Sequence, residues 1–468
     1  MLPGLGIFLI SFITFFRNIG SYPLRNWDEA WYGEIIKNMA SGTYGYMVPF
    51  WNGQYYFDKP PLYFWLSLPF FKLSPPPAGG GEWQARIVSA TAAAVATLLV
   101  YLIGKKLFNP VCGLLSALVF LTLGQVVIRF ASGNLDGLLV CLFLSSFYFY
   151  LRSNESKLFP ALAGISLGLG FLTKGYFLGL FPALLITLYS ISTTKKLPKN
   201  LILITSSALI SSLWWYVLGT IKFGKPFFDW YVLSPGGNLL KLPLSSFSMS
   251  YFGDLIRDVG FWWIPIATAA IYVGKNIASK EKNVLVSLVA AVFLFIFPLN
   301  FLSEKLRWYN LPAYPLLTII VGYFASKMIK DYPKITTVLI AIVTIAQIYN
   351  VIRIENIFPD RSKVGADLGI HAASLIPQED TVILDDHDFT SFLYYSDHKK
   401  VFMVQKNGGK AGEWWILDYT NLPQFVKTQS KTWIITPDPN NLPRDLKNPK
   451  TEATFNGYTF ISFTADTI

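Results

Sequence analysis

The sequence predicts a polytopic α-helical membrane protein that ends in a small soluble α/β domain. Of its 468 residues, 53% are hydrophobic and 14% are charged, whereas charged residues make up about a quarter of an ordinary soluble protein. The apolar residues gather in runs long enough to cross a bilayer as a helix, which takes roughly 20 residues. After residue 352 these runs stop, and short β-rich segments follow.

Apolar runs predict the membrane-spanning helices. We expect about eleven spans, with eleven to thirteen compatible with the pattern, at about 2–19, 86–104, 110–129, 137–151, 158–173, 176–192, 200–219, 259–274, 284–302, 308–326 and 335–352. The first run has no basic n-region and no small-residue cleavage site, so we interpret it as a retained anchor.

Basic residues predict the orientation of these helices. With the N-terminus inside, the short inner loops contain 13 basic and three acidic residues, as at Lys105–Lys106 and Lys195–Lys196. The excess of basic residues in cytoplasmic loops therefore predicts a multi-pass protein of the inner (plasma) membrane with a cytoplasmic N-terminus. The loops 21–85 and 220–258 and the C-terminal tail are then expected on the periplasmic or extracellular side.

The predicted domains are a transmembrane domain, 1–352, and an exoplasmic α/β domain, 353–468. From position 353 onward there are 12 basic and 15 acidic residues, against 27 and 13 before it. The basic excess therefore belongs to the membrane part, and it does not indicate a nucleic-acid partner. In the tail we expect strands at Thr381–Leu384, Val401–Val404, Trp433–Thr436 and Tyr458–Phe463 and a helix at Arg361–Leu375.

The first outer loop begins with a predicted surface helix. Asn26 and Glu29 have the spacing of a capping box, and Gly42 is expected to end the helix. Asp28 falls in the first turn, where a carboxylate is favoured by the helix dipole alone. A structural role is therefore the alternative to a chemical role for both acids.

Three further sites on the outer side carry charge. Lys59 stands between Asp58 and two prolines, in stiff, extended backbone near the interface, where a lysine can bind lipid phosphate generally or one specific phosphate. Asp136 lies at the outer end of a span, where an N-cap role is the alternative. Lys305 and Arg307 flank aromatic residues at another outer end, as simple interface anchors also do.

The predicted topology brings these charged residues to one membrane face. Sugar transfer from a lipid phosphate needs a base for the acceptor hydroxyl and positive charge for the departing phosphate, which carboxylates and fixed cations beside lipid supply. The sequence contains no glycine-rich nucleotide motif, which favours a lipid-linked donor over a sugar nucleotide.

Several motifs resemble one family. They are Asp28-Glu29-Ala30-x-Tyr32, Asn52-Gly53, Lys59-Pro60-Pro61-Leu62-Tyr63, Gly168-Leu169-x-Phe171-Leu172-Thr173-Lys174-Gly175 and Lys305-x-Arg307-x-Tyr309-x-x-Pro312-x-Tyr314-Pro315. From about residue 20 to 350 the chain resembles the bacterial protein-mannosyltransferase and lipid A aminoarabinose-transferase (ArnT-like) group of the C-type glycosyltransferase superfold. A soluble exoplasmic C-terminal domain is usual in that group.

The resemblance implies roles for individual residues. Asp28 is the candidate catalytic base, with Asp136 and Glu29 as further acidic candidates. Lys59 is expected to bind the polyprenyl phosphate. Arg307, Lys305, Tyr309 and Tyr32 are further candidates for donor binding, and Asp58 stands where a carboxylate can help to hold a divalent metal ion, the one cofactor considered.

Two departures from the family pattern stand out. The family often has Arg where this chain has Trp31, and its loop after the seventh span can supply a His and an Arg, which Phe227–Val232 and the following residues are not expected to provide. All three histidines, His371, His387 and His398, lie in the tail, where we expect them at the surface. A histidine-containing zinc site in the membrane region is therefore not expected.

The leading hypothesis is an integral-membrane glycosyltransferase. It would move a sugar from an undecaprenyl-phosphate type of donor to an exoplasmic acceptor such as lipid A, another glycolipid or a protein hydroxyl, in contact with membrane lipids. A transporter or flippase of lipid-linked sugar is the alternative, but such proteins carry charges near the bilayer midplane, and these spans have few charges away from their ends. A scaffold or sensor that reads the envelope through its tail is a third class.

Overall fold

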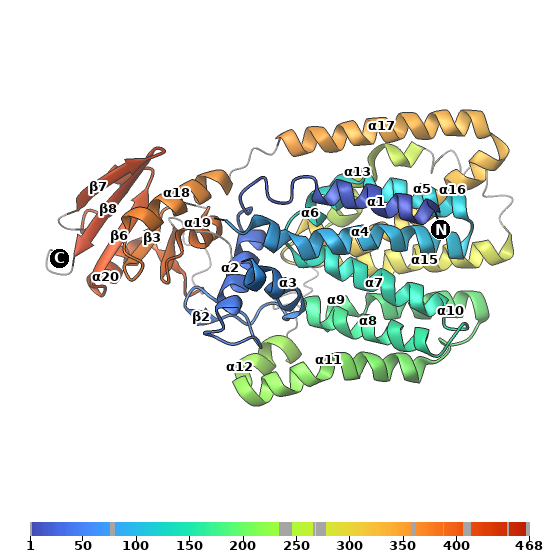
Figure 1. The fold of residues 1–468 in the computed structure, drawn as a ribbon, viewed down its shortest axis with the longest axis horizontal. Helices are drawn as coiled ribbons and strands as arrows, with labels where there is room; N and C mark the ends of the chain where they lie inside the picture. Colours follow the sequence, from blue (N-terminus) through green and yellow to red (C-terminus); the bar gives the residue numbers. More distant parts are fainter. Residues whose placement is uncertain are drawn as a thin grey trace.

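The molecule is elongated, with a bundle of long helices at one end and a mixed β-sheet at the other (Figure 1). The computed structural model describes residues 2–74, 80–233, 246–264, 267, 278–357, 362–386, 388–405, 413–446 and 449–464. The N-terminus lies at the end of the bundle remote from the sheet.

Apolar helices make up the bundle. They are α1 (Leu2–Phe16), α4 (Glu82–Leu107), α5 (Pro110–Leu121), α6 (Gly124–Phe130), α7 (Leu135–Leu151), α8 (Leu158–Lys174), α9 (Tyr176–Gly179), α10 (Phe181–Thr194), α11 (Leu201–Phe223), α15 (Ser279–Leu299), α16 (Tyr314–Asp331) and α17 (Pro333–Ile357). Among the described residues, six stretches are long and apolar enough to cross a membrane: α4, α9 with α10, α11, α15, the 3₁₀ turn η5 (Arg307–Ala313) with α16, and α17. If the pair α5 and α6, which is bent by 67°, is one further span, the number of candidate spans among the described residues rises to seven. The predicted class, a polytopic helical membrane protein, is confirmed.

The number of spans depends on the shorter helices. Helix α1 has 15 residues, and α7 and α8 have 17 each, fewer than the roughly 20 that a perpendicular crossing needs. They coincide with the predicted spans 2–19, 137–151 and 158–173. The predicted span 259–274 falls largely outside the described residues, so the total of eleven stays a prediction.

Helices α8 and α11 approach each other closely at two glycines. A Cβ on Gly164 would lie 2.2 Å from the Ile204 carbonyl oxygen, and one on Gly168 would lie 2.3 Å from the Ala208 carbonyl oxygen. Glycines four residues apart on one helix face let backbones touch, which drives helix association where lipid offers no hydrophobic gain. The glycine-containing motif of α8 is therefore a packing device as well as part of the family pattern.

The first outer loop forms α2 (Asp28–Ser41), the hairpin β1 (Phe50–Trp51) and β2 (Gln54–Tyr55), and α3 (Leu62–Leu73). Gly42 ends α2 with a φ of 75°, as predicted. The predicted capping box is wrong, because Trp27 occupies the N-cap position and makes no side-chain cap, while the Asn26 side chain bonds to the C-terminal domain. The Glu29 half of the motif does not form either, since Glu29 Oε2 accepts from the backbone N–H of Arg25, one residue before the predicted N-cap, at 2.7 Å.

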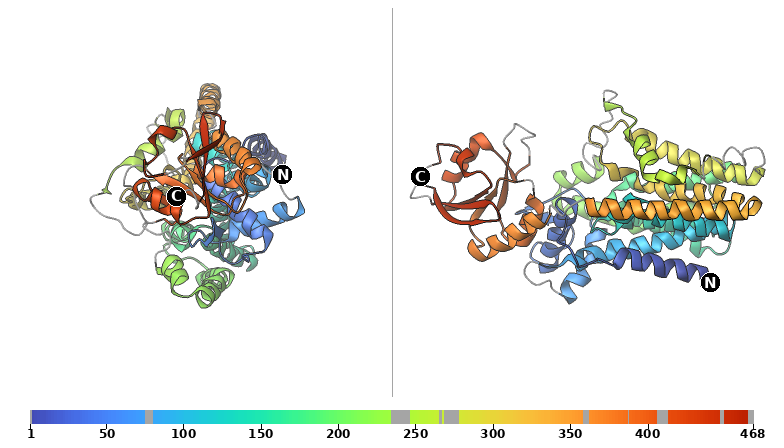
Figure 2. Two further views of the ribbon diagram at one scale, coloured as in Figure 1. Left: turned by 90° about the vertical axis from the view of Figure 1, so that its left-hand side faces the viewer. Right: turned by 90° about the horizontal axis from the view of Figure 1, so that it is seen from above.

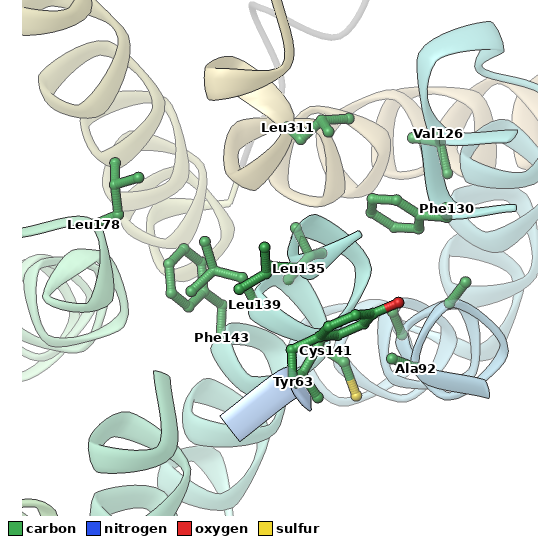
Figure 3. Close-up of a cluster of buried hydrophobic side chains, with 14 of the residues drawn as sticks. Tyr63, Ala92, Val126, Phe130, Leu135, Leu139, Cys141, Phe143, Leu178 and Leu311 are labelled. Carbon is green, nitrogen blue, oxygen red and sulfur yellow. The ribbon is translucent and has the colours of Figure 1, made fainter. Parts of the chain in front are cut away.

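An apolar core lies among α3, α4, α6 and α7. Figure 3 shows Tyr63 of α3 and Phe130 of α6 on either side of Leu135 and Leu139, at the start of α7. The Tyr63 hydroxyl donates to the Ala85 carbonyl oxygen at 2.6 Å, so this buried donor has a hydrogen-bond partner. The core thereby fixes the N-terminus of α7 against α3, α4 and α6.

The C-terminal domain contains a six-stranded sheet of order β5-β4-β3-β6-β8-β7 (Figure 2). Its elements are α18 (Ser362–Leu375), β3 (Thr381–Leu384), α19 (Phe389–Ser396), β4 (Val401–Gln405), β5 (Ile416–Asp418), α20 (Leu422–Lys427), β6 (Lys431–Thr436), β7 (Lys450–Phe455) and β8 (Tyr458–Thr464). Strands β5, β4, β3 and β6 are parallel, whereas β8 and β7 add antiparallel pairs. The predicted α/β tail is confirmed.

The predicted surface position is wrong for one histidine of the tail, His398, while His371 is half-buried. His398 is buried, and its Nε2 lies 3.2 Å from the Ile376 carbonyl oxygen. Burial lowers the pKa of His398 below its usual value. The His371 ring stacks on Phe455, and His387 lies outside the described residues.

Candidate active site

Charged side chains from five elements meet where the bundle faces the C-terminal domain. Asp28 begins α2, Lys59 follows β2, Arg129 ends α6, Asp136 begins α7 and Lys174 ends α8. Elements that are far apart in the sequence thus place carboxylates and cations together.

Four of these groups form a continuous chain of alternating charge. The Arg129 guanidinium donates from Nη2 to Asp28 Oδ2 and from Nε to Asp136 Oδ2, the latter at 2.8 Å. The Lys174 ammonium donates to the other Asp136 oxygen, Oδ1, at 2.5 Å. Alternation lets each buried charge find an opposite partner, which is what makes its burial tolerable.

The two aspartates of this chain differ in access. The Asp136 side chain is 5% exposed, and both of its oxygens are bonded to cations. The Asp28 side chain is 28% exposed, and in the described part of the chain only Arg129 pairs with it. Asp28 is therefore the more accessible of the two carboxylates, while Asp136 holds the two cations in place.

The alternative interpretation of Asp136 as an N-cap is wrong. Asn134 caps α7, with its side chain accepting the Asp136 backbone N–H at 2.9 Å. The Asp136 carboxylate is thus free of helix capping and turns to Arg129 and Lys174.

Lys59 lies beside this chain. Burial opposes its charge, but the Asp58 carboxylate at 2.8 Å, with Asp28 and Asp136 also near, raises the pKa of Lys59 above its usual value. The Tyr231 hydroxyl fixes the local backbone by donating to the Lys59 carbonyl oxygen at 3.0 Å. Lys59 therefore stays protonated at neutral pH, as a phosphate-binding cation must.

Aromatic rings cover the cations of the site. Trp308 of η5 stacks over Arg129, with 4.1 Å between the guanidinium carbon and the ring centroid. The Lys174 ammonium lies 5.2 Å from the centroid of Tyr309. Tyr32 is buried, and burial together with Asp28 and Asp58 raises its pKa well above the usual value, so its phenol remains a neutral hydrogen-bond donor. Both tyrosines that the family resemblance pointed to thus border the charged site.

Arg307 joins a second charged cluster. Its guanidinium pairs with the buried carboxylate of Asp258, which also accepts from the Tyr314 hydroxyl. Arg257 lies on the same carboxylate, with its Nε 3.7 Å away. The expectation that Phe227–Val232 and the following residues provide no arginine is therefore wrong, since Arg257 follows in α13 (Ser250–Val259) and is exposed to solvent.

Lys305 turns away from the acidic groups. Its ammonium donates to the backbone carbonyl oxygens of Ser246 and Leu302, at 2.6 Å each. In the described structure Lys305 thus holds two loop segments together, and its place among the donor-binding candidates stays a prediction.

Glu29, the third acidic candidate, is enclosed. Its side chain is 3% exposed and accepts from Arg86 Nε at 2.7 Å, from Arg86 Nη2 at 3.1 Å and from the Gly133 backbone N–H at 2.6 Å. Burial would raise the pKa of Glu29, but Arg86 and Arg25 more than offset it, so the pKa is lowered. An ionised carboxylate with its oxygens occupied ties α2 to α4 and to the start of α7.

The residues present do not fit a bound divalent metal ion. The Asp58 carboxylate is already paired with the Lys59 ammonium. Across the described ranges, no three His, Cys, Asp or Glu side chains gather as a ligand set. We therefore derive no catalytic step through a metal.

An apolar groove of about 520 Å³ lies beside the site. Its walls come from α8, α11 and the π-helix η1 (Asp229–Leu233), and include Phe171, Leu213 and Val217. The Tyr176 hydroxyl donates to the Val232 carbonyl oxygen at 2.7 Å, at the edge of the groove. Because the neighbouring Tyr231 bonds to the Lys59 backbone, η1 links this groove to the phosphate-binding candidate.

Two residues in the row of alternating charges were not predicted as site residues from the sequence. Arg129 carries no motif, and its only signal is its position at the outer end of a span, seven residues before Asp136. Lys174 stands in the Leu-Thr-Lys-Gly motif, but its role becomes visible only when α8 is packed against α7.

Comparisons with known proteins agree with this architecture. Residues 58–216 match the model of the dolichyl-phosphate-mannose-protein mannosyltransferase family. The undecaprenyl phosphate-alpha-4-amino-4-deoxy-L-arabinose arabinosyl transferase of Pseudomonas savastanoi is 30% identical over 188 residues, which cover 39% of this chain and 34% of that protein. An uncharacterized protein of Aquifex aeolicus is 27% identical over 352 residues, which cover 73% of this chain and 78% of that protein. The chain thus spans about a third of the length of the arabinosyl transferase that it matches.

Solved structures share the fold over nearly the whole chain. ArnT from Cupriavidus metallidurans, bound to undecaprenyl phosphate, superposes with a TM-score of 0.76 at 14% identity, over 98% of this chain and 97% of that chain. The archaeal oligosaccharyltransferase AglB from Archaeoglobus fulgidus, in complex with an inhibitory peptide and a dolichol-phosphate, gives a TM-score of 0.59 at 13% identity, over 92% and 69%.

The fold and the matched segment define a multi-pass membrane glycosyltransferase of the C-type superfold. Within that class, residues 58–216 match the dolichyl-phosphate-mannose-protein mannosyltransferase family and the whole chain has the fold of ArnT, in agreement with the resemblance that its motifs predicted.

Proposed function

We propose that this protein transfers a sugar from an undecaprenyl-phosphate type of donor to a hydroxyl group on the exoplasmic side of the membrane. The observation that carries the proposal is the reachable Asp28 carboxylate, held by Arg129 and flanked by the Lys59 ammonium, next to an apolar groove. The relative solved with undecaprenyl phosphate and the one solved with dolichol-phosphate support a lipid-phosphate donor.

The reaction assigns one task to each charge. Asp28 accepts the proton of the acceptor hydroxyl as its oxygen attacks the anomeric carbon of the donor. The bond between that carbon and the phosphate oxygen breaks, and polyprenyl phosphate leaves with the bonding electrons. Lys59 stabilises the negative charge of the leaving phosphate. Arg129 and Lys174 add to the positive electrostatic potential of the site.

The groove beside η1 suits the polyprenyl chain. Its lining is apolar, and Leu213, Val217 and Ile221 of α11 expose much of their side chains. An exposed apolar wall at membrane depth offers an isoprenoid the same environment as lipid, so the chain can enter from the bilayer while the phosphate reaches Lys59.

The orientation follows from the basic inner loops. The proposal has the N-terminus in the cytoplasm, the charged site at the outer face, and residues 353–468 in the periplasm or outside the cell. Lipid A, another glycolipid and a protein hydroxyl are the acceptor classes to be tested.

The experiment uses the purified full-length protein in lipid nanodiscs. Undecaprenyl-phosphate aminoarabinose and undecaprenyl-phosphate mannose are each offered with lipid A or with a serine- and threonine-containing peptide, and products are measured by mass spectrometry. We expect transfer with one of these pairs by the wild type and at least a hundredfold less by Asp28→Asn, with binding of undecaprenyl phosphate retained. Wild-type rates in Asp28→Asn would remove Asp28 from the mechanism, and no binding of undecaprenyl phosphate by the wild type would refute the donor class.

A further inference from the structure

The C-terminal domain touches the segment that carries the proposed base. Helix α19 lies beside α2 in Figure 1, and every residue of α19 is buried. Further bonds cross the same boundary: the Tyr395 hydroxyl accepts from the Leu24 backbone N–H at 2.8 Å and donates to Glu82 at 2.7 Å. The segment leading into α2 is therefore held from both the bundle and the C-terminal domain.

Asn26 caps α19 across this boundary. Its Oδ1 accepts from the backbone N–H groups of Thr390 and Ser391, at 3.0 and 3.2 Å. These N–H groups lie in the first turn of α19, where a helix has no partner of its own for them. Asp388, at the N-cap position of α19, makes no side-chain capping bond, so an asparagine from the first outer loop supplies the cap.

The Thr390 hydroxyl also bonds to the residue directly before Asp28. Its hydroxyl donates to Asn26 Oδ1 at 2.6 Å and accepts from the Trp27 backbone N–H at 2.5 Å. Both polar capacities of this fully buried hydroxyl are thus spent on residues 26 and 27.

Trp27 adopts a backbone conformation that needs such support. Its φ of 65° and ψ of −122° are unfavourable for a bulky L-residue, and its own side chain makes no cap for α2. Because Trp27 directly precedes Asp28, the direction in which α2 starts, and with it the Asp28 carboxylate, depends on this strained residue.

We propose that Thr390 and Asn26 are positioning residues, through which the C-terminal domain holds Asp28 against Arg129 for the transfer reaction. The inference rests on the proposed role of Asp28 as the base. It makes α19 a structural part of the transferase site, although no residue of α19 touches the reacting groups. A misplacement of a catalytic group by about 1 Å can cost roughly a hundredfold in rate.

The test compares Thr390→Val, which keeps the side-chain volume and removes the hydroxyl, with Thr390→Ser, which keeps the hydroxyl. The matched control is Asp397→Asn at the other end of α19, which removes an ion pair with Lys37 across the same boundary and suits the left-handed backbone at that position. The readouts are kcat, KM for the donor, binding of undecaprenyl phosphate and the midpoint of thermal unfolding.

We expect Thr390→Val to lower kcat at least tenfold, with donor binding within twofold of the wild type. Thr390→Ser should restore most of the rate, and Asp397→Asn should match the wild type. An unchanged kcat in Thr390→Val overturns the inference, as does a loss that disappears when rates are expressed per donor-binding site, because that would be a loss of folded protein only. If Thr390→Val does not fold, Asn26→Ala against Asn26→Asp, which retains the cap, decides the question by the same criteria.

Asp28→Asn is measured in parallel to separate the two proposals. An inactive Asp28→Asn with an unaffected Thr390→Val refutes the positioning role alone. An active Asp28→Asn refutes the base, and any defect of Thr390→Val would then have another origin, so both proposals would fall.

Discussion

Asp28 and Glu29 are adjacent acids in different surroundings, and the proposed function gives a catalytic role to Asp28 alone, which two isosteric substitutions can test. Glu29→Gln removes a buried charge that is bonded to Arg86 and to two backbone N–H groups, whereas Asp28→Asn removes a charge that is partly exposed to solvent. The first should lower stability, and the second should lower the rate.

The expected magnitudes follow from the two environments. Glu29 and Arg86 are 3% and 5% exposed, and Glu29→Gln leaves the Arg86 charge buried without an anion, which typically costs about 3–5 kcal/mol. Asp28 and Arg129 are 28% and 17% exposed, and Arg129 keeps Asp136 as a partner. Asp28→Asn should therefore cost no more than about 1 kcal/mol in stability, while the rate falls by roughly 10²–10⁴ through loss of the base.

The pH dependence of stability provides a second signature of Glu29. Its pKa is lower in the folded protein than the ordinary value of 4.5. The stabilisation is therefore complete above about pH 4.5 and is lost as the pH falls toward the lowered folded-state pKa. Glu29→Gln should lack this acid-dependent step, so the stability difference from the wild type should shrink below pH 4.5.

The assay measures unfolding midpoints of purified protein in detergent between pH 4 and 8, and transfer rates per folded molecule at neutral pH. We expect Glu29→Gln to unfold at lower temperature with a rate per folded molecule within a fewfold of the wild type. A variant that unfolds like the wild type but loses transfer would refute the structural role and return Glu29 to the catalytic candidates.

Three further predictions concern the donor site and the bundle. Lys59→Gln should weaken undecaprenyl phosphate binding at least tenfold, whereas Lys59→Arg should retain part of the affinity. Calorimetric titration with the lipid in nanodiscs measures the affinity. Unaltered binding by Lys59→Gln would exclude Lys59 from the phosphate site. Val217→Trp should narrow the groove and raise KM for a long-chain donor more than for a two-isoprene analogue, and equal effects on both donors would exclude the groove as the chain site. Gly168→Ala should lower the midpoint of thermal unfolding, because its Cβ would lie 2.3 Å from the Ala208 carbonyl oxygen. The control Gly170→Ala, whose Cβ would have its nearest contact at 3.9 Å, should not. Equal unfolding midpoints for the two variants would show that α8 and α11 can separate freely.

The fold class was predictable because the bilayer imposes length and composition on each helix. The tail strands β3 and β6 were visible for a similar reason, since both lie inside the sheet, are almost wholly buried and contain a short apolar run. Edge strand β7 reads Lys-Thr-Glu-Ala-Thr-Phe and is largely exposed, so no apolar run marked it. Helix α19 also gave no signal, because it is buried on all sides and shows no amphipathic period.

Parts of the candidate site were predictable because local motifs carry them. Asp28 and Lys59 stand in short patterns that the family resemblance picks out, and the predicted topology brings them to one side of the membrane. The partners of Asn26 were not predictable, since Thr390 and Ser391 lie more than 360 residues away along the chain. A capping box and a cap across domains have the same local sequence, and only the tertiary structure distinguishes them.

The tryptophan at position 31 shows how a departure from the family pattern is compensated elsewhere in the chain. Trp31 lies one helical turn after Asp28, stacks on Trp51 at 4.2 Å between ring centroids and packs edge-on against Trp415 of the C-terminal domain. A guanidinium from this position would have to displace that aromatic contact in order to reach Asp28. In this structure Asp28 has a guanidinium partner in Arg129, which lies in the last turn of α6, after the 67° bend from α5 and 101 residues after Asp28. Trp31 can therefore contact the C-terminal domain while Asp28 keeps a cationic partner. The absence of the family arginine at position 31 does not argue against a catalytic role for Asp28.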